Sequence, residues 1–146
     1  MTNAITPIEK VIYTAKAHTT GGRDGGGSRT SDGRLDVKLS VPGTPGTGTN
    51  PEQLFAVGYA ACFHSALKSV AAKEHVDVSQ SAVTVRVGIG HDDADGGFGL
   101  RVEVVGELPG VPADEAGSLM AKAHAVCPYS KATRGNIEAH LSLAES

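Results

Sequence analysis

One long apolar run constrains the fold more than any other part of the chain. It follows Asn50, Pro51 and Glu52, where asparagine can cap a helix, proline fits its first position and a carboxylate favours its first turn. We predict a helix from Pro51 to about Glu74, apolar on nearly every face until Lys68. A helix that is hydrophobic all round must be covered on all sides, which one small domain does poorly alone. We therefore expect a partner chain.

Alternating apolar and polar residues predict strands on both sides of this helix. The predicted strands are Lys10–His18, Leu35–Val41, Ser81–Gly90, Phe98–Leu108 and Asn136–Leu143. A second helix is predicted over Pro112–Cys127, with Pro128 as its stop signal. The first two strands should pair as a hairpin across a glycine-dense turn, and so should the next two across an Asp/Gly turn. The order β-β-α-β-β-α-β predicts an α+β fold with helices against antiparallel sheet, in a single domain over residues 1–146.

Composition argues against several classes of partner. The net charge is −3 and aromatic residues make up 4% of the chain, so neither a basic patch nor stacking residues favour nucleic acid or a membrane surface. The N-terminal residues lack the basic and apolar regions of a signal peptide, so we expect a cytoplasmic protein. Structural disulfides are rare in that compartment.

The two cysteines are therefore informative. Cys62 lies inside the apolar helical run, and Cys127 ends the second predicted helix. One interpretation is that both are core thiols, because free cysteine is among the most buried residue types. The other is a dithiol that cycles between reduced and disulfide forms, with Cys127 as the more mobile partner.

A reactive Cys62 would need a cation, because only the thiolate is nucleophilic and burial disfavours it. Arg23, in the glycine-rich loop, is the best candidate, and Glu52 or Asp24 could hold its guanidinium. Glu52 and Cys62 are ten positions apart, or about 15 Å along a continuous helix. A site that uses both would need Glu52 of the partner subunit or a break in the helix.

Other chemistries are disfavoured. The histidines show no compact spacing with the cysteines, so no metal site is predicted. The serines lack the G-x-S-x-G motif of a hydrolase, and the glycine loop lacks the G-K-[ST] end of a phosphate-binding loop.

Four motifs are similar to those of a known family. They are TGGRDG at Thr20–Gly25, SDGRLDVKLS at Ser31–Ser40, NPEQLFAVGYAACF at Asn50–Phe63 and VCPYSKATRGNI at Val126–Ile137. Together they span nearly the whole chain in order. The sequence resembles the organic hydroperoxide resistance proteins, within the wider group of osmotically inducible peroxidases.

The resemblance implies a thiol-dependent peroxidase with Cys62 as peroxidatic and Cys127 as resolving cysteine. Arg23 and Glu52 match the family's polar pair that activates the thiolate. The resemblance further implies an intertwined homodimer with antiparallel sheets around the long central helix, a preference for organic hydroperoxides over hydrogen peroxide, no metal, haem or flavin, and re-reduction by a lipoylated protein. We expect an apolar substrate pocket near Phe55 and Phe63.

Three alternatives stay open. The chain could belong to a sister branch with another peroxide preference. It could be a non-enzymatic dimer that binds hydroperoxides or lipids and has structural thiols. It could be a redox sensor that passes its disulfide to a partner protein.

Overall fold

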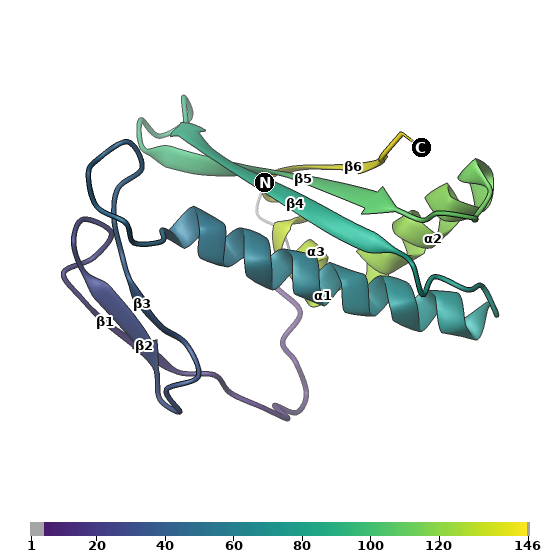
Figure 1. Cartoon of the computed structure of the whole chain (residues 1–146), viewed down its shortest axis with the longest axis horizontal. Coiled ribbons are helices and arrows are strands. Elements are labelled where there is room, and N and C mark those ends of the chain that lie inside the picture. Colours follow the sequence, from purple (N-terminus) through teal and green to yellow (C-terminus); the bar gives the residue numbers. More distant parts are fainter. Residues whose placement is uncertain (1–4, 146) are drawn as a thin grey trace. The chain divides into compact units, whose positions relative to one another are not determined.

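The computed structural model describes residues 5–145. The chain groups into two compact units that divide between Leu54 and Phe55. Figure 1 labels the helices and strands of the chain. The first unit contains strands β1 (Ala17–Thr20), β2 (Gly27–Thr30) and β3 (Asp36–Lys38) and the first turn of helix α1 (Pro51–Lys73). The second unit contains the rest of α1, strands β4 (Ala82–His91), β5 (Phe98–Glu107) and β6 (Glu138–Leu143), and helices α2 (Ala113–Val126) and α3 (Pro128–Thr133).

The first unit is built on a three-stranded antiparallel sheet in the order β1-β2-β3. The predicted hairpin between Lys10–His18 and Leu35–Val41 is wrong, because β2 forms inside the predicted glycine turn and lies between its neighbours. The glycines make this possible: Gly21 has a φ of 77°, and a Cβ on Gly26 would lie 2.2 Å from the carbonyl oxygen of Gly22. The chain therefore reverses within a few residues and leaves room for an extra strand.

The predicted first strand also begins too early. Residues 9–16 have no regular secondary structure, and β1 begins only at Ala17. Alternating side chains form a strand only where a neighbouring strand pairs with them, and these residues find none within the described part of the chain. Their apolar side chains stay exposed, with Ile12 at 92% and Tyr13 at 77%.

The second unit contains a sheet in the order β4-β5-β6. β4 and β5 form the predicted antiparallel hairpin, in register from Ala82 opposite Glu107 to His91 opposite Phe98. The prediction of wholly antiparallel sheets is wrong for β6, which runs parallel to β5. The reason is the connection: the chain leaves β5, passes through α2 and α3, and returns in the same direction, as parallel neighbours require.

Helix α1 begins and ends as its sequence predicts. The side chain of Asn50 accepts a hydrogen bond of 2.8 Å from the backbone N–H of Gln53, which is the expected capping contact. Tyr59, Phe63, Leu67 and Ala71 are buried at spacings of four residues, so one face of α1 packs into the hydrophobic core.

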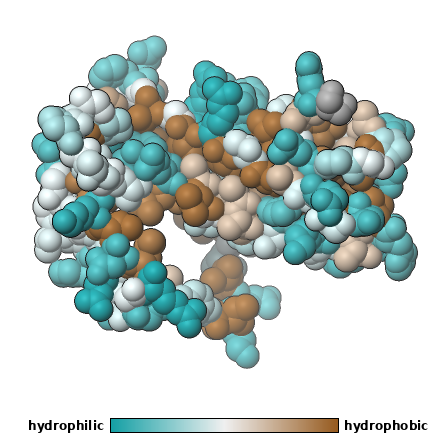
Figure 2. Space-filling model, in the orientation of Figure 1, coloured by the Kyte–Doolittle hydropathy of each residue, from teal (hydrophilic) through white to brown (hydrophobic). Residues whose placement is uncertain are grey.

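The other faces of α1 are less covered within this chain. Val57 is 70% exposed, and apolar side chains reach the surface in the region of α1 (Figure 2). Among the described residues, α1 alone is long and apolar enough to cross a bilayer by length and composition. Core helices of folded proteins meet the same test, and the buried face of α1 packs as such a helix does.

A strained residue follows α1 and permits a prediction about stability. His75 has a φ of 58°, in the left-handed region that favours glycine, while Val76 closes the helix by donating to the carbonyl of Ala71 at 2.9 Å. His75→Gly should raise the free energy of unfolding by about 0.5–1 kcal/mol, measured by urea denaturation. Ala72→Gly, one turn earlier in the exposed helix, should lower it by about 1 kcal/mol. A destabilised His75→Gly variant would contradict this account.

Candidate active site

Cys62 lies in the middle of α1 and is half-buried. Its thiol is free, and its side chain packs against the hydrophobic core of the second unit. The helix presents it on the face that also carries Gly58, because residues four positions apart share a face.

Cys127 lies between two helices, because of the proline that follows it. The α conformation is disfavoured before proline, and Cys127 is extended, with φ −66° and ψ 124°. Pro128 was predicted to stop the helix; it does end α2, but it also occupies the first position of α3, where its missing N–H costs nothing. Cys127 still donates to Ala123 and accepts from Lys131, at 2.8 and 2.9 Å. The fully buried thiol is thus held at a fixed joint between α2 and α3.

The two thiols meet. Cys62 and Cys127 are close neighbours, and the backbone N–H of Tyr129 lies beside the Cys62 thiol. Burial raises the pKa of the Cys62 thiol, the Tyr129 N–H lowers it in part, and the neighbouring Cys127 raises it further. Within the second unit, the surroundings of Cys62 therefore favour the neutral thiol over the thiolate.

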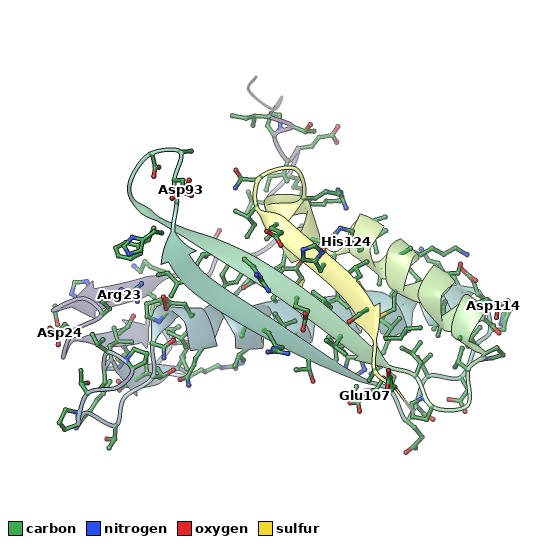
Figure 3. All side chains as sticks on the ribbon, turned by 90° about the horizontal axis from the view of Figure 1, so that it is seen from above. Arg23, Asp24, Asp93, Glu107, Asp114 and His124 are labelled. Carbon is green, nitrogen blue, oxygen red and sulfur yellow. The ribbon has the colours of Figure 1, made fainter. Side chains whose placement is uncertain are left out.

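Arg23 and Glu52 form an ion pair within the first unit. One guanidinium nitrogen of Arg23 lies 2.9 Å from Oε1 and 3.3 Å from Oε2 of Glu52. Glu52 is the more enclosed partner, with 13% of its side chain exposed against 48% for Arg23. Of the two predicted carboxylate partners, Glu52 makes the contact, while Asp24 is the next residue along the same loop (Figure 3).

The structure also shows that α1 has no break between Glu52 and Cys62. Because α1 is continuous from Pro51 to Lys73, Glu52 stays in its first turn, away from the turn that carries Cys62. Glu52 holds the Arg23 of its own chain.

Sequence reasoning missed the group that attaches α3 to α1. The hydroxyl of Tyr59, on α1, makes hydrogen bonds of 2.9 Å with Ser130 and 3.2 Å with Thr133, both on α3, and all three residues are buried. A signal was present: a tyrosine in an apolar helix needs a polar partner, and Ser130 and Thr133 follow Cys127 at helical spacing.

The two predicted pocket residues have different surroundings. Phe55 is half-buried, and its ring centroid lies 6.0 Å from that of Tyr59 and 5.9 Å from that of Tyr129. Phe63 is fully buried in the hydrophobic core, so it offers no surface to a ligand in this structure. Tyr129, which the prediction omitted, is 37% exposed and adjoins Cys62 through its backbone. Its position in the sequence, two residues after Cys127, could have indicated that it lies at the site.

Among residues 5–145, no three His, Cys, Asp or Glu side chains cluster closely enough to hold a metal ion. His64, two residues after Cys62, makes a hydrogen bond of 3.0 Å with Ser81 and is part of the packing between α1 and the start of β4.

Comparison with known proteins places the chain in a family. The sequence model of the OsmC-like protein family matches residues 42–142. The organic hydroperoxide resistance protein of Xanthomonas axonopodis pv. citri is 52% identical over 93% of this chain and 97% of its own length. Organic hydroperoxide resistance protein OhrA of Bacillus subtilis is 48% identical over 94% of this chain and 100% of its own length.

The fold agrees with that placement. The crystal structure of the organic hydroperoxide resistance protein OhrB of Bacillus subtilis superposes with a TM-score of 0.87 at 42% identity, covering 92% of this chain and 100% of the other. Family sequence model, curated relatives and solved structure agree over most of the chain. The chain belongs to the OsmC-like family, among the organic hydroperoxide resistance proteins.

Proposed function

We propose that this protein is a thiol-dependent peroxidase that reduces organic hydroperoxides, including those of fatty acids, to alcohols. The observation that carries the proposal is the contact between a half-buried Cys62 and a fully buried Cys127, both free thiols. The names of the relatives support it, because they are called organic hydroperoxide resistance proteins at 48–52% identity.

The reaction begins at the sulfur of Cys62. Its thiolate attacks the distal oxygen of the hydroperoxide, the O–O bond breaks, and the alkoxide leaves as an alcohol after taking up a proton. Cys62 is then a sulfenic acid. The Cys127 thiol attacks that sulfur and displaces the oxygen as water, which closes a Cys62–Cys127 disulfide. An external dithiol reduces the disulfide by exchange through a mixed disulfide.

In this proposal Arg23 supplies the cation that the thiolate needs. The Cys62 environment in the second unit opposes ionisation, so a charge from elsewhere must favour it. A guanidinium also stabilises the charge that develops on the departing oxygen. Glu52 holds Arg23 by the ion pair and leaves part of the guanidinium exposed, at 48% of the side chain.

The alkyl part of the substrate binds to aromatic side chains in this proposal. Phe55 and Tyr129 lie together, and Tyr129 is partly exposed beside Cys62. Burial of an alkyl chain against such rings favours organic hydroperoxides over hydrogen peroxide, which has no chain to bury.

We further propose a cytoplasmic homodimer that needs no metal, haem or flavin and is reduced by a lipoylated protein. Apolar residues that one chain leaves exposed support the dimer, since a second copy would cover them. Besides Val57 on α1, they include the N-terminal residues Ile5, Ile8, Val11, Ile12 and Tyr13.

The test is a peroxide-consumption assay on the purified protein with dihydrolipoamide as reductant. We expect turnover of cumene hydroperoxide, much slower turnover of hydrogen peroxide, and no effect of a metal chelator. Equal use of both peroxides would indicate the sister-branch specificity. Binding of a hydroperoxide or lipid without turnover, in protein whose thiols are reduced, would favour the binding-protein alternative.

The resolving role of Cys127 gives a separate prediction. Cys127→Ser should retain one rapid turnover, because Cys62 remains, and then accumulate a sulfenic acid. Sustained cycling with dihydrolipoamide should fall by about tenfold or more, since no buried thiol protects the sulfenate from further oxidation. Trapping with dimedone and mass spectrometry measures the sulfenate. Normal cycling in this variant would assign resolution to another thiol.

A further inference from the structure

Two tyrosines link α1 and α3 in opposite directions. Tyr59 extends from α1 and bonds to Ser130 and Thr133 of α3. Tyr129 extends from α3 toward α1, where its ring centroid lies 5.5 Å from that of Tyr59. This pair, Tyr59 and Tyr129, fixes the short helix that directly follows Cys127.

Gly58 provides the space for the second of these contacts. A Cβ at Gly58 would lie 2.6 Å from the hydroxyl oxygen of Tyr129, 3.1 Å from its Cζ and 3.4 Å from its Cε2. A glycine in the interior of a helix is unfavourable relative to alanine, so its presence calls for a reason. The approach of Tyr129 to the bare backbone of α1 accounts for a glycine here, four positions before Cys62.

The backbone of Tyr129 connects this contact to the thiols. Its N–H lies beside the Cys62 thiol, and Cys127 is two residues earlier in the same turn. Pro128 lies between them and restricts the chain to φ near −65°. A displacement of the Tyr129 ring from α1 is therefore transmitted over two residues to the Cys127 thiol.

We propose that Gly58 is a positioning residue for disulfide formation: by admitting the Tyr129 ring onto α1, it holds the Cys127–Tyr129 turn where the two sulfurs can bond. The inference deepens the proposed function, which supplies the peroxide that drives the disulfide, but it is tested without peroxide. A disulfide requires the two Cβ atoms to lie about 3.5–4.5 Å apart. A small displacement of Cys127 relative to Cys62 therefore disfavours the bond.

The test is the equilibrium between the protein dithiol and glutathione redox buffers. The Cys62 thiolate attacks oxidised glutathione and releases one reduced glutathione; Cys127 then displaces the second and closes the disulfide. Mass spectrometry after acid quenching separates the reduced, glutathionylated and disulfide forms. We expect Gly58→Ala to lower the equilibrium constant for the intramolecular disulfide by about tenfold or more and to increase the mixed disulfide.

Gly117→Ala is the matched control. Gly117 is also inside a helix, α2, but it is exposed and a Cβ there would meet no atom within 4 Å. Both variants gain the same helix propensity, so any difference between them isolates the contact with Tyr129. Gly117→Ala should keep the wild-type equilibrium constant.

A second substitution separates positioning from general damage. Tyr129→Phe removes the oxygen that lies 2.6 Å from the added Cβ, so Gly58→Ala/Tyr129→Phe should recover much of the lost equilibrium constant. Tyr129→Phe alone should keep the wild-type equilibrium constant for the disulfide, because the ring remains. Tyr129→Ala should lower the constant as Gly58→Ala does, and it serves as the test if Gly58→Ala fails to fold.

The outcomes are distinguishable from those of the peroxidase assay. Equal constants for Gly58→Ala and Gly117→Ala, or no recovery in the double variant, would overturn the positioning role even if the protein consumes peroxide. The expected pattern in a protein that consumes no peroxide would support the positioning role and overturn the proposed function.

Discussion

Cys62→Ser is expected to abolish consumption of organic hydroperoxides with any dithiol reductant. Serine retains the shape of the side chain but is not ionised at neutral pH, so the proposed reaction loses its nucleophile. Loss of a nucleophile lowers turnover by on the order of 10⁴-fold or more. The measurement is the consumption of cumene hydroperoxide with dihydrolipoamide, in parallel with wild type.

The variant should otherwise resemble wild type. Cys62 is half-buried, and its replacement by serine removes no large packing group, so the melting temperature and oligomeric state should change little. Cys127 is buried and should not replace it as nucleophile. Retained turnover in Cys62→Ser would refute the proposed mechanism and leave the thiols as structural residues.

Arg23→Ala is expected to slow the first oxidation of Cys62 by about 10²–10³-fold, as does the loss of one preorganised donor in other active sites. The rate is that of thiol loss in single-turnover reactions with cumene hydroperoxide. Burial raises the pKa of Cys62, and removal of the cation proposed to act on it destabilises the thiolate further. The midpoint of Cys62 alkylation against pH should therefore move to higher pH in Arg23→Ala.

Arg34→Ala is the control for this prediction. Arg34 is also a loop arginine, but its side chain is 90% exposed and its Nε lies 3.7 Å from the carboxylate of Asp32. It should leave both the rate and the alkylation profile unchanged. Glu52→Gln should cause a smaller loss than Arg23→Ala, because the guanidinium remains but loses its ionic partner. An Arg23→Ala variant with the wild-type alkylation profile would remove Arg23 from the mechanism.

Local signals in the sequence predicted α1, which carries Cys62, and the hairpin of β4 and β5. The capping sequence at Asn50 places the start of α1, and strict alternation on either side of an Asp/Gly turn places β4 and β5 in their hairpin. The resemblance pointed to Arg23 and Glu52 as a pair, and the structure brings them within 2.9 Å. These signals succeed because each depends on a few neighbouring residues.

The errors arose where pairing depends on distant parts of the chain. Strand β2 was not predicted, because it lies in a glycine-rich segment without alternating apolar residues. The alternating residues after Lys10 pair with no strand in the described part of the chain. The parallel direction of β6 depends on the path through α2 and α3. Phe63 was predicted to line a pocket, but the periodicity of α1 directs it into the core. Periodicity identifies a buried face without saying which neighbour covers it.

The extended conformation of Cys127 bears on how much the protein must reorganise in the proposed reaction. Because Cys127 is outside both helices, its N–H and C=O bonds to Ala123 and Lys131 need not break when its sulfur bonds to Cys62 in the proposed reaction. The reduced and oxidised forms can then share one set of backbone hydrogen bonds. In the proposed reaction, neither α2 nor α3 then has to unwind.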